Sequence, residues 1–292
     1  MEINSSLCNA NKTIIIRGGG DLATGVVQKF YRSGFKVLIL EVETPTAIRR
    51  SVSLSEAVYD GVAIVEDMTC RKVSSIDELG SCWQAGEIPI LVDPDGEIIN
   101  SIKPDAVIDA IMAKKNLGTS LSMASVTIAL GPGFYAGKDV HAVIETLRGH
   151  DLGRLILQGC AKPDTGIPGE IAGESIRRVI RAPANGTVVH KKQIGDIVEC
   201  GDVLFSIADD GGVLKEVTAP IGGLLRGLIR EDTQVHSGMK VADIDARTDI
   251  DWRTISDKAR CIGGAVLEAF YYLSSNGAEL RNNNQAREID NV

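Results

Sequence analysis

The chain has 292 residues, of which 44% are hydrophobic, and 31 basic against 39 acidic residues give it a formal net charge of −8. Such a length can bury one large or two modest cores, and the hydrophobic content is that of a globular protein. The acidic balance and the lack of any lysine- or arginine-rich run argue against nucleic acid as a partner, because affinity for a phosphate backbone needs concentrated positive charge.

The sequence carries no signal for export or membrane insertion. Its start is polar and asparagine-rich, and no stretch approaches the roughly 18 apolar residues of a membrane span. Six cysteines are scattered without a C-x-x-C pair, so their spacing predicts neither a metal site nor a disulfide framework. We therefore expect a cytoplasmic protein without a bound metal that acts on small molecules or protein partners.

The N-terminal half reads as strands alternating with helices. An apolar run at 13–17 is followed by Gly18-Gly19-Gly20, a helical pattern at 21–35 and a second apolar run at 36–41. Further apolar runs follow at 62–65, 88–92, 106–112, 125–130 and 154–158. This order predicts a Rossmann-like parallel sheet domain over residues 1–160, and a glycine- and proline-rich linker at 161–178.

Residues 179–247 contain short valine- and isoleucine-rich runs between glycine turns, with an internal repeat. Ala182-Pro183 recurs 37 positions later as Ala219-Pro220, and the same offset relates four further pairs: Gly186 and Gly223, Val198 and Val235, Gly201 and Gly238, Ile207 and Ile244. The pattern resembles the barrel-sandwich hybrid of lipoyl and biotinyl domains. Its hairpin at 208–212 lacks the acceptor lysine, and the nearest one, Lys215, is displaced, so we expect no covalent biotin or lipoate.

The C-terminal region is predicted to be simpler. A helix within 248–280 has apolar residues at helical spacing and should pack back on the body, whereas the asparagine-rich tail at 281–292 should be disordered. The predicted fold class is thus α/β plus all-β.

The first candidate site is the glycine turn before the first helix. Gly18-x-Gly20-x-x-Ala23 follows a strand and opens a helix, and Glu41 ends the next strand, where dinucleotide-binding domains keep a ribose-binding acid. Asp21 at the helix start disagrees, because its charge would oppose a phosphate there. Nucleotide binding and a purely structural turn both remain open.

The second candidate site is a glycine loop at Gly131, Gly133 and Gly137, followed by Lys138 and Asp139. A strand, a glycine loop and a predicted helix over 139–147 would form an anion cradle, with Lys138 neutralising a phosphate or carboxylate and Asp139 serving equally well as a plain cap. The alternative is a tight turn without a ligand.

Polar side chains recur on one face of that predicted helix. His141, Glu145 and Arg148 have helical spacing, and His150 follows at its end. His141, Glu145 and His150 are therefore the acid–base candidates, and Arg148 a candidate ligand contact, against the alternative of a solvated face. Asp109 interrupts an apolar run, so its carboxylate must be paired, hydrogen-bonded or facing a cleft, and we expect it to face the ligand.

Seven segments together resemble the YqeB family: 129–134, 136–146, 148–150, 152–154, 165–171, 181–183 and 259–265. The resemblance implies an accessory protein of selenium-dependent molybdenum hydroxylases, whose first domain is similar to the Rossmann part of XdhC-type chaperones for molybdenum cofactor. It supplies no catalytic residues.

The leading hypothesis is therefore a maturation factor for such a hydroxylase, its client protein. It would bind a phosphate-bearing ligand, with molybdopterin cytosine dinucleotide or an adenine or cytosine nucleotide as candidates. The alternatives are a nucleotide-dependent oxidoreductase or transferase and a scaffold without a ligand. The sequence leaves open the ligand, any catalysis, the handling of selenium and homo-oligomerisation.

Overall fold

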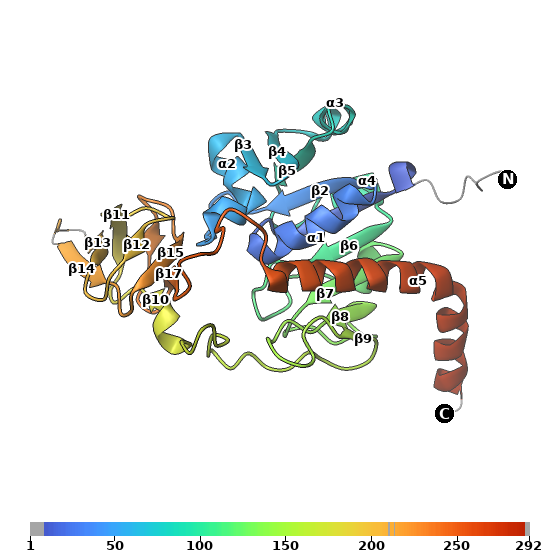
Figure 1. The fold of residues 1–292 in the computed structure, drawn as a ribbon. Coiled ribbons are helices and arrows are strands. Elements are labelled where there is room, and N and C mark those ends of the chain that lie inside the picture. Colours follow the sequence, from blue (N-terminus) through green and yellow to red (C-terminus); the bar gives the residue numbers. More distant parts are fainter. Residues whose placement is uncertain (1–8, 210, 213, 290–292) are drawn as a thin grey trace.

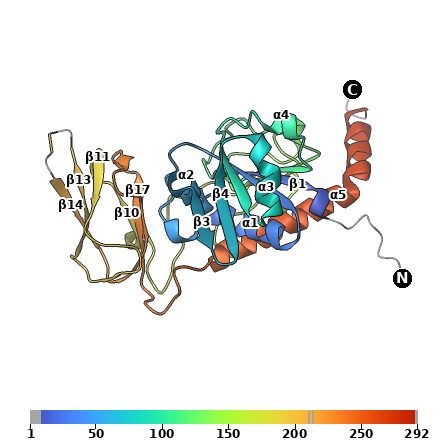
Figure 2. The same cartoon turned by 90° about the horizontal axis from the view of Figure 1, so that it is seen from above.

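The computed structural model describes residues 9–209, 211–212 and 214–289, which form two bodies lying side by side (Figure 1). The larger, the α/β body, is built around a nine-stranded sheet; the smaller, the β body, consists of two four-stranded sheets within residues 179–245. After the β body, the chain returns to the α/β body as its longest helix (Figure 2).

The large sheet has the strand order β3-β4-β5-β2-β1-β6-β7-β8-β9. In chain order the strands are β1 (Thr13–Arg17), β2 (Lys36–Glu41), β3 (Val62–Val65), β4 (Met68–Val73), β5 (Ile88–Val92), β6 (Ala106–Asp109), β7 (Val126–Leu130), β8 (Ala142–Ile144) and β9 (Leu155–Ile156). Its central strands are parallel and nearly continuous in buried apolar residues, as expected for a sheet covered on both faces.

The α-helices are α1 (Asp21–Arg32), α2 (Ala57–Asp60), α3 (Leu79–Gln84), α4 (Ile99–Ile102) and α5 (Asp257–Ile289). Short 3-10 turns are η2 (Asn9–Asn11), η3 (Arg50–Val52), η4 (Leu54–Glu56), η5 (Ile76–Glu78), η6 (Leu121–Met123) and η7 (Ile176–Arg178). In the described part of the chain, no helix is long and apolar enough to cross a membrane.

Helices α1 and α5 pack against each other on one face of the large sheet (Figure 1). Ala23, Val26, Val27 and Phe30 form a buried apolar stripe on α1 at helical spacing. Phe30 meets Phe270 of α5 edge to face, with ring centroids 5.6 Å apart. This contact places the N-termini of both helices at the same end of the sheet, beside the β body.

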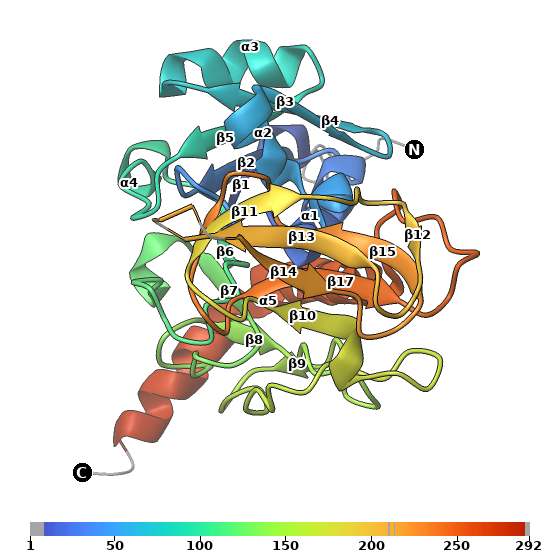
Figure 3. The ribbon, with the colours of Figure 1, turned by 90° about the vertical axis from the view of Figure 1, so that its left-hand side faces the viewer.

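The β body contains sheets β10-β17-β15-β12 and β14-β13-β11-β16 (Figure 3). The strands are β10 (Val179–Arg181), β11 (Gly186–His190), β12 (Ile197–Val198), β13 (Val203–Ala208), β14 (Leu214–Thr218), β15 (Gly223–Leu228), β16 (Gln234–Val235) and β17 (Lys240–Asp245). Asp210 and Val213, in the hairpin that lacks an acceptor lysine, lie outside the described residues.

The 37-residue repeat is visible in the strand pairing. Gly186 pairs with Val235, and its repeat mate Gly223 pairs with Val198, so each half lends a short strand to the other sheet. Both glycines have left-handed φ values, 145° and 147°. A Cβ at Gly186 would lie 2.2 Å from the carbonyl oxygen of Ala208. Only glycine therefore suits the start of these two strands.

The predicted fold class is wrong in both of its parts. The large sheet is mixed rather than Rossmann-like and parallel, because β3 and β9 run antiparallel to their neighbours at its two edges. The β body consists of two small antiparallel sheets and is not the predicted barrel of lipoyl or biotinyl type. Apolar periodicity locates strands but not their direction, which here depends on turns such as Glu66, with φ 51°.

The predicted helix over 139–147 is also wrong. Residues Ala142–Ile144 form the buried strand β8, parallel to β7, and loops flank it. Apolar residues at 140, 143, 144 and 147 fit a helix, but a short apolar run also fits a buried strand.

The C-terminal helix is longer than predicted. Helix α5 continues to Ile289, so it includes most of the tail predicted to be disordered, whose last three residues lie outside the described part. The predicted linker at 161–178 contains no strand and ends in η7.

Candidate anion-binding cleft

A cleft of about 370 Å³ separates the carboxyl ends of the central strands from the β body. From the α/β body it is lined by the start of α1 at Asp21, the segment after β8 around Arg148, and the start of α5 at Lys258. From the β body it is lined by Arg178 and Lys240, among others. Ligands of open α/β sheets bind at this edge.

The cleft carries an excess of positive charge although the chain is acidic overall. Nine basic side chains line it: Arg49, Lys114, Arg148, Lys162, Arg178, Arg181, Arg226, Lys240 and Lys258. Only four acidic side chains do so: Asp21, Asp164, Asp243 and Asp257. In a protein of net charge −8, such a concentration of cations creates a local field that attracts anions.

Two arginines in the cleft have buried donors without partners. Arg178 is only 4% exposed, and although its terminal nitrogens reach Gly169 O at 2.9 Å and Asp243 Oδ1 at 3.2 Å, its Nε lacks a hydrogen-bond partner. The Arg49 side chain is 10% exposed and lies 3.3 Å from Asp21 Oδ2, and its Nε is equally unpartnered. Both Nε atoms are closed to solvent, as are five other unpartnered side-chain atoms of the described residues, so what these two arginines add to the cleft is their positive charge.

A buried ion-pair network holds Arg178 in place. Arg226 donates to Asp243 Oδ2 at 2.8 Å and to Asp245 Oδ2 at 2.6 Å, and Asp243 also accepts from Arg178. Because Asp243 and Asp245 are each 2% exposed or less, the network is desolvated and rigid. It therefore forms a fixed floor on the β-body side of the cleft.

The opposite wall holds two further cations: Lys258, in the first turn of α5, and Arg148, which follows β8 and contacts the first residue of α5. Arg148 donates to the two carboxylate oxygens of Asp257 at 2.9 and 3.1 Å, and this hydrogen bonding lowers the pKa of Asp257. Lys258 is half-buried, and burial lowers the pKa of its ammonium group; the carboxylate of Asp21 opposes this fall, and the cations Arg148 and Lys240 add to it. A bound anion would relieve this unfavourable placement of charge.

The first predicted site, the glycine turn, is largely filled by the protein itself. Gly19 N donates to Glu41 Oε2 at 2.7 Å, and Val42 N donates to its other oxygen at 2.8 Å. A Cβ at Gly18 would lie 3.0 Å from Ala110 O, and one at Gly19 3.0 Å from Ser55 N. The backbone of Ala110 and Ser55 therefore occupies the space beside this turn that a dinucleotide would need.

The remaining members of that motif have mixed placements. Burial raises the pKa of Glu41 despite its two backbone hydrogen bonds. Ala23 is buried in the α1 stripe. Gly20 has open space where a Cβ would lie and directly precedes α1, whose first residues line the cleft.

The glycines of the second predicted site allow close packing. A Cβ at Gly131 would lie 2.5 Å from Thr146 Oγ1, and one at Gly133 2.6 Å from Lys115 N. Gly137 has a left-handed φ of 84°. Neither Lys138, which is exposed, nor Asp139, which accepts from Tyr135 N at 2.8 Å, is among the cleft residues.

The predicted acid–base residues are not assembled in the cleft. His141 Nδ1 lies 2.8 Å from Thr127 Oγ1, and His150 is exposed. The buried Glu145 accepts from Leu147 N at 2.7 Å and from Lys162 N at 2.8 Å, so its carboxylate organises the loop. Of the second site, only Arg148 lines the cleft.

Asp109 belongs to a separate buried cluster. It accepts from Thr119 Oγ1 at 2.6 Å and lies 3.9 Å from Arg17 Nη1. Burial raises its pKa, while Thr119 and Arg17 oppose the rise. Asp109 therefore pairs within the protein and, contrary to expectation, is not among the residues that line the cleft.

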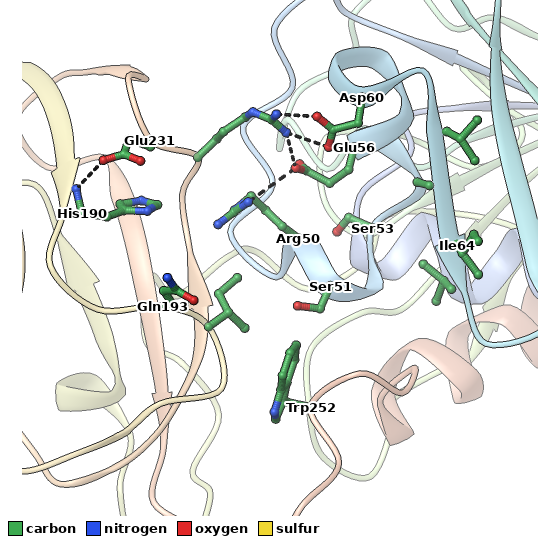
Figure 4. Close-up of a pocket in the computed structure, with 15 residues that line it drawn as sticks. Arg50, Ser51, Ser53, Glu56, Asp60, Ile64, His190, Gln193, Glu231 and Trp252 are labelled. Atoms are coloured by element: carbon green, nitrogen blue, oxygen red, sulfur yellow. Dashed lines mark hydrogen bonds and ion pairs between the residues drawn. The ribbon is translucent and has the colours of Figure 1, made fainter.

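A second pocket of about 610 Å³ lies between the bodies near β3 (Figure 4). Its arginines are already paired. Arg230 contacts Glu56 at 3.0 Å and also Asp60, and Arg50 lies 3.8 Å from Glu56. Because its charges are balanced, this pocket is a less favourable site for an anion than the cleft is.

Sequence reasoning missed most of the cleft. Arg49, Arg178, Lys240 and Lys258 lie far apart in the chain and in no shared motif. Among the described residues, no group of three histidine, cysteine or acidic side chains could hold a metal ion.

The structure is that of an α/β protein with an attached β body and a cationic cleft between them. No model of a known protein family matches the chain. The chain is 48% identical over 272 residues to the uncharacterized protein YqeB of Escherichia coli strain K12. The aligned region covers 93% of this chain and 49% of that protein. The similarity supports the YqeB family as the family of this chain, which spans about half the length of that relative.

Similar solved structures are remote. The ectoine utilization protein EutE (DoeB) of Ruegeria pomeroyi has a TM-score of 0.26 at 10% identity, with 81% of this chain and 86% of that chain covered. A succinylglutamate desuccinylase/aspartoacylase of Rhodobacter sphaeroides has a TM-score of 0.27 at 11% identity, with coverages of 81% and 86%. Likenesses this weak support no conclusion about function.

The molybdenum, selenium and nucleotide-binding descriptions drawn from the sequence find no support in the comparisons, since the curated relative is itself uncharacterized. The mixed sheet also shows that the α/β body does not have the predicted Rossmann-like parallel sheet.

Proposed function

We propose that this protein binds a small anionic ligand, bearing phosphate or carboxylate groups, in the cleft between its two bodies. The observation that carries the proposal is the lining of the cleft, in which nine basic side chains stand against four acidic ones. A concentration of positive charge in a concave site attracts ligands of the opposite charge.

The site favours binding over catalysis. Glu145 is held by backbone N–H groups and His141 by Thr127, so neither is placed to exchange protons with a ligand in the cleft. The basic side chains there offer donors and positive charge. A binding or carrier protein is therefore the role that this chemistry supports best.

The more specific role rests on the YqeB resemblance alone. That resemblance implies an accessory protein for a selenium-dependent molybdenum hydroxylase, with the hydroxylase as protein partner. The cationic cleft is compatible with a phosphate-bearing cofactor as the ligand in that role. The similarity to an uncharacterized relative adds no test of it.

The proposal is tested by thermal unfolding and calorimetry with phosphate, pyrophosphate, citrate and cytidine nucleotides. A ligand that binds only the folded protein at 100 times its Kd adds about 2.7 kcal/mol of stability and raises the Tm. Arg148→Met should weaken binding, whereas Lys138→Met, a matched loss of charge outside the cleft, should not. If none of these anions binds, the proposal is wrong and the scaffold alternative gains.

A further inference from the structure

We infer that the ligand carries at least two negatively charged groups, as in a pyrophosphate or a pyrophosphate-linked nucleotide, and that it bridges the α/β body and the β body. This inference rests on the proposed function and specifies the class of anion. It follows from where the unsatisfied positive charge lies.

The α/β side of the cleft has its own unsatisfied cations. Lys258 is half-buried at the start of α5 with no ion-pair partner within the described residues, and Arg49 and Arg148 line the same wall, each paired with one aspartate. The start of α1 lines the same wall, but Asp21 stands there and its carboxylate offsets the partial positive charge of the helix N-terminus, so the lysine and arginine side chains supply the charge. One anionic group would be held here.

The β-body side has a second, separately anchored set. Arg178 is fixed by Asp243 and Gly169 O and lines the cleft. Lys240, at the start of β17, also lines the cleft and has no ion-pair partner in the described part of the chain. These cations belong to a body with its own hydrophobic core, so they form a wall distinct from α1 and α5.

Charge balance separates this cleft from a site for a single anionic group. Asp21 and Asp257 pair with Arg49 and Arg148, and Asp243 and Asp245 pair with Arg178 and Arg226, so Lys258 on one wall and Lys240 on the other remain without an ion pair in the described residues. One phosphate or carboxylate would leave the other wall uncompensated. A ligand with two charged groups serves both walls, and a volume of about 370 Å³ lies within the range of small-molecule sites.

Direct contacts between the two bodies hold the two walls of the cleft in place. Leu228 N donates to Ile48 O at 2.8 Å, and Arg50 Nε donates to Leu228 O at 2.8 Å. Ile48, from the α/β body, packs in the hydrophobic core of the β body. These contacts hold the walls opposite one another.

The experiment compares inorganic phosphate with pyrophosphate by calorimetry, on the unaltered chain and on three single variants. Lys258→Met removes charge from the α/β wall, Lys240→Met from the β-body wall, and Lys138→Met from the exposed loop outside the cleft. Both cleft lysines are at or near the surface, so folding should persist; circular dichroism checks it.

Pyrophosphate is expected to bind about tenfold or more tightly than phosphate, because it engages charged donors on both walls. Lys258→Met and Lys240→Met should each weaken pyrophosphate binding about tenfold and phosphate binding less, with Lys138→Met unchanged. If pyrophosphate binds and only Lys258→Met weakens it, or if phosphate binds equally well, the bridging inference is wrong and the proposed function stands. If neither pyrophosphate nor phosphate binds, both are wrong.

Discussion

The crossing of α1 and α5 depends on two glycines in direct contact. A Cβ at Gly263 would lie 2.3 Å from Gly25 O and 2.8 Å from Gly25 C. Both atoms are backbone within a helix, so they cannot turn aside as a flexible side chain would. The Gly263→Ala variant must therefore push α5 away from α1.

The expected free-energy change combines two opposing effects. Adding a methyl group to a packed interface costs about 1–3 kcal/mol, and the upper end applies here because the obstacle is backbone. Replacing glycine by alanine in a helix recovers about 1 kcal/mol. Gly263→Ala should thus lower the free energy of unfolding by about 2 kcal/mol.

Gly264 provides a matched control on the same helix. It is exposed, and a Cβ there would meet nothing within 4 Å. Gly264→Ala should therefore raise the free energy of unfolding by up to about 1 kcal/mol. Urea denaturation with an unchanged m value measures both variants, and shifts of equal sign and size would refute the reasoning. Because α5 begins at Asp257 beside the cleft, Gly263→Ala should also weaken anion binding.

Three further predictions concern the β body, the cleft and covalent modification. Asp243→Ala leaves Arg178 and Arg226 without their shared buried partner, so the free energy of unfolding should fall by about 3–5 kcal/mol in urea denaturation; a loss below about 1 kcal/mol would show that the network adds little. Because burial lowers the pKa of Lys258, its charge is lost as pH rises before the ordinary lysine value of 10.5; pyrophosphate affinity measured by calorimetry should fall over that interval, and Lys258→Met should flatten the profile. Electrospray mass spectrometry of the β body from protein made in its own cell should show no added biotinyl or lipoyl mass, and such a mass would contradict the prediction from the hairpin.

Several local features could be predicted from the sequence because neighbouring residues determine them. Gly18-Gly19-Gly20 marks the turn between β1 and α1, and the apolar spacing from Ala23 to Phe30 specifies the buried face of that helix. The repeat also predicted a structural equivalence, since Gly186 and Gly223 need the same left-handed φ at the start of matching strands. Backbone conformation and side-chain periodicity act over a few residues, so these signals can be read from the sequence.

Other features depended on long-range packing. Residues Ala142–Ile144 form a strand because β7 offers them an edge with which to pair, although their spacing also fits a helix. Glycine loops that resembled ligand cradles instead receive neighbouring backbone, as Gly133 does from Lys115. The same apolar or glycine-rich sequence is thus compatible with two local structures, and tertiary contacts determine which one forms.

The candidate site was decided by the tertiary structure alone. Arg148 was identified from its predicted helical neighbours, but it lies in the cleft because of the loop after β8. Arg49, Arg178 and Lys258 come from three remote parts of the chain, and each is unremarkable in its own sequence context. What the sequence determined by itself was the local conformation of its elements; which charges converge, and which of their donors are left without a partner, depends on how the two bodies pack, because electrostatic and hydrogen-bonding environments are set by distance and burial in space.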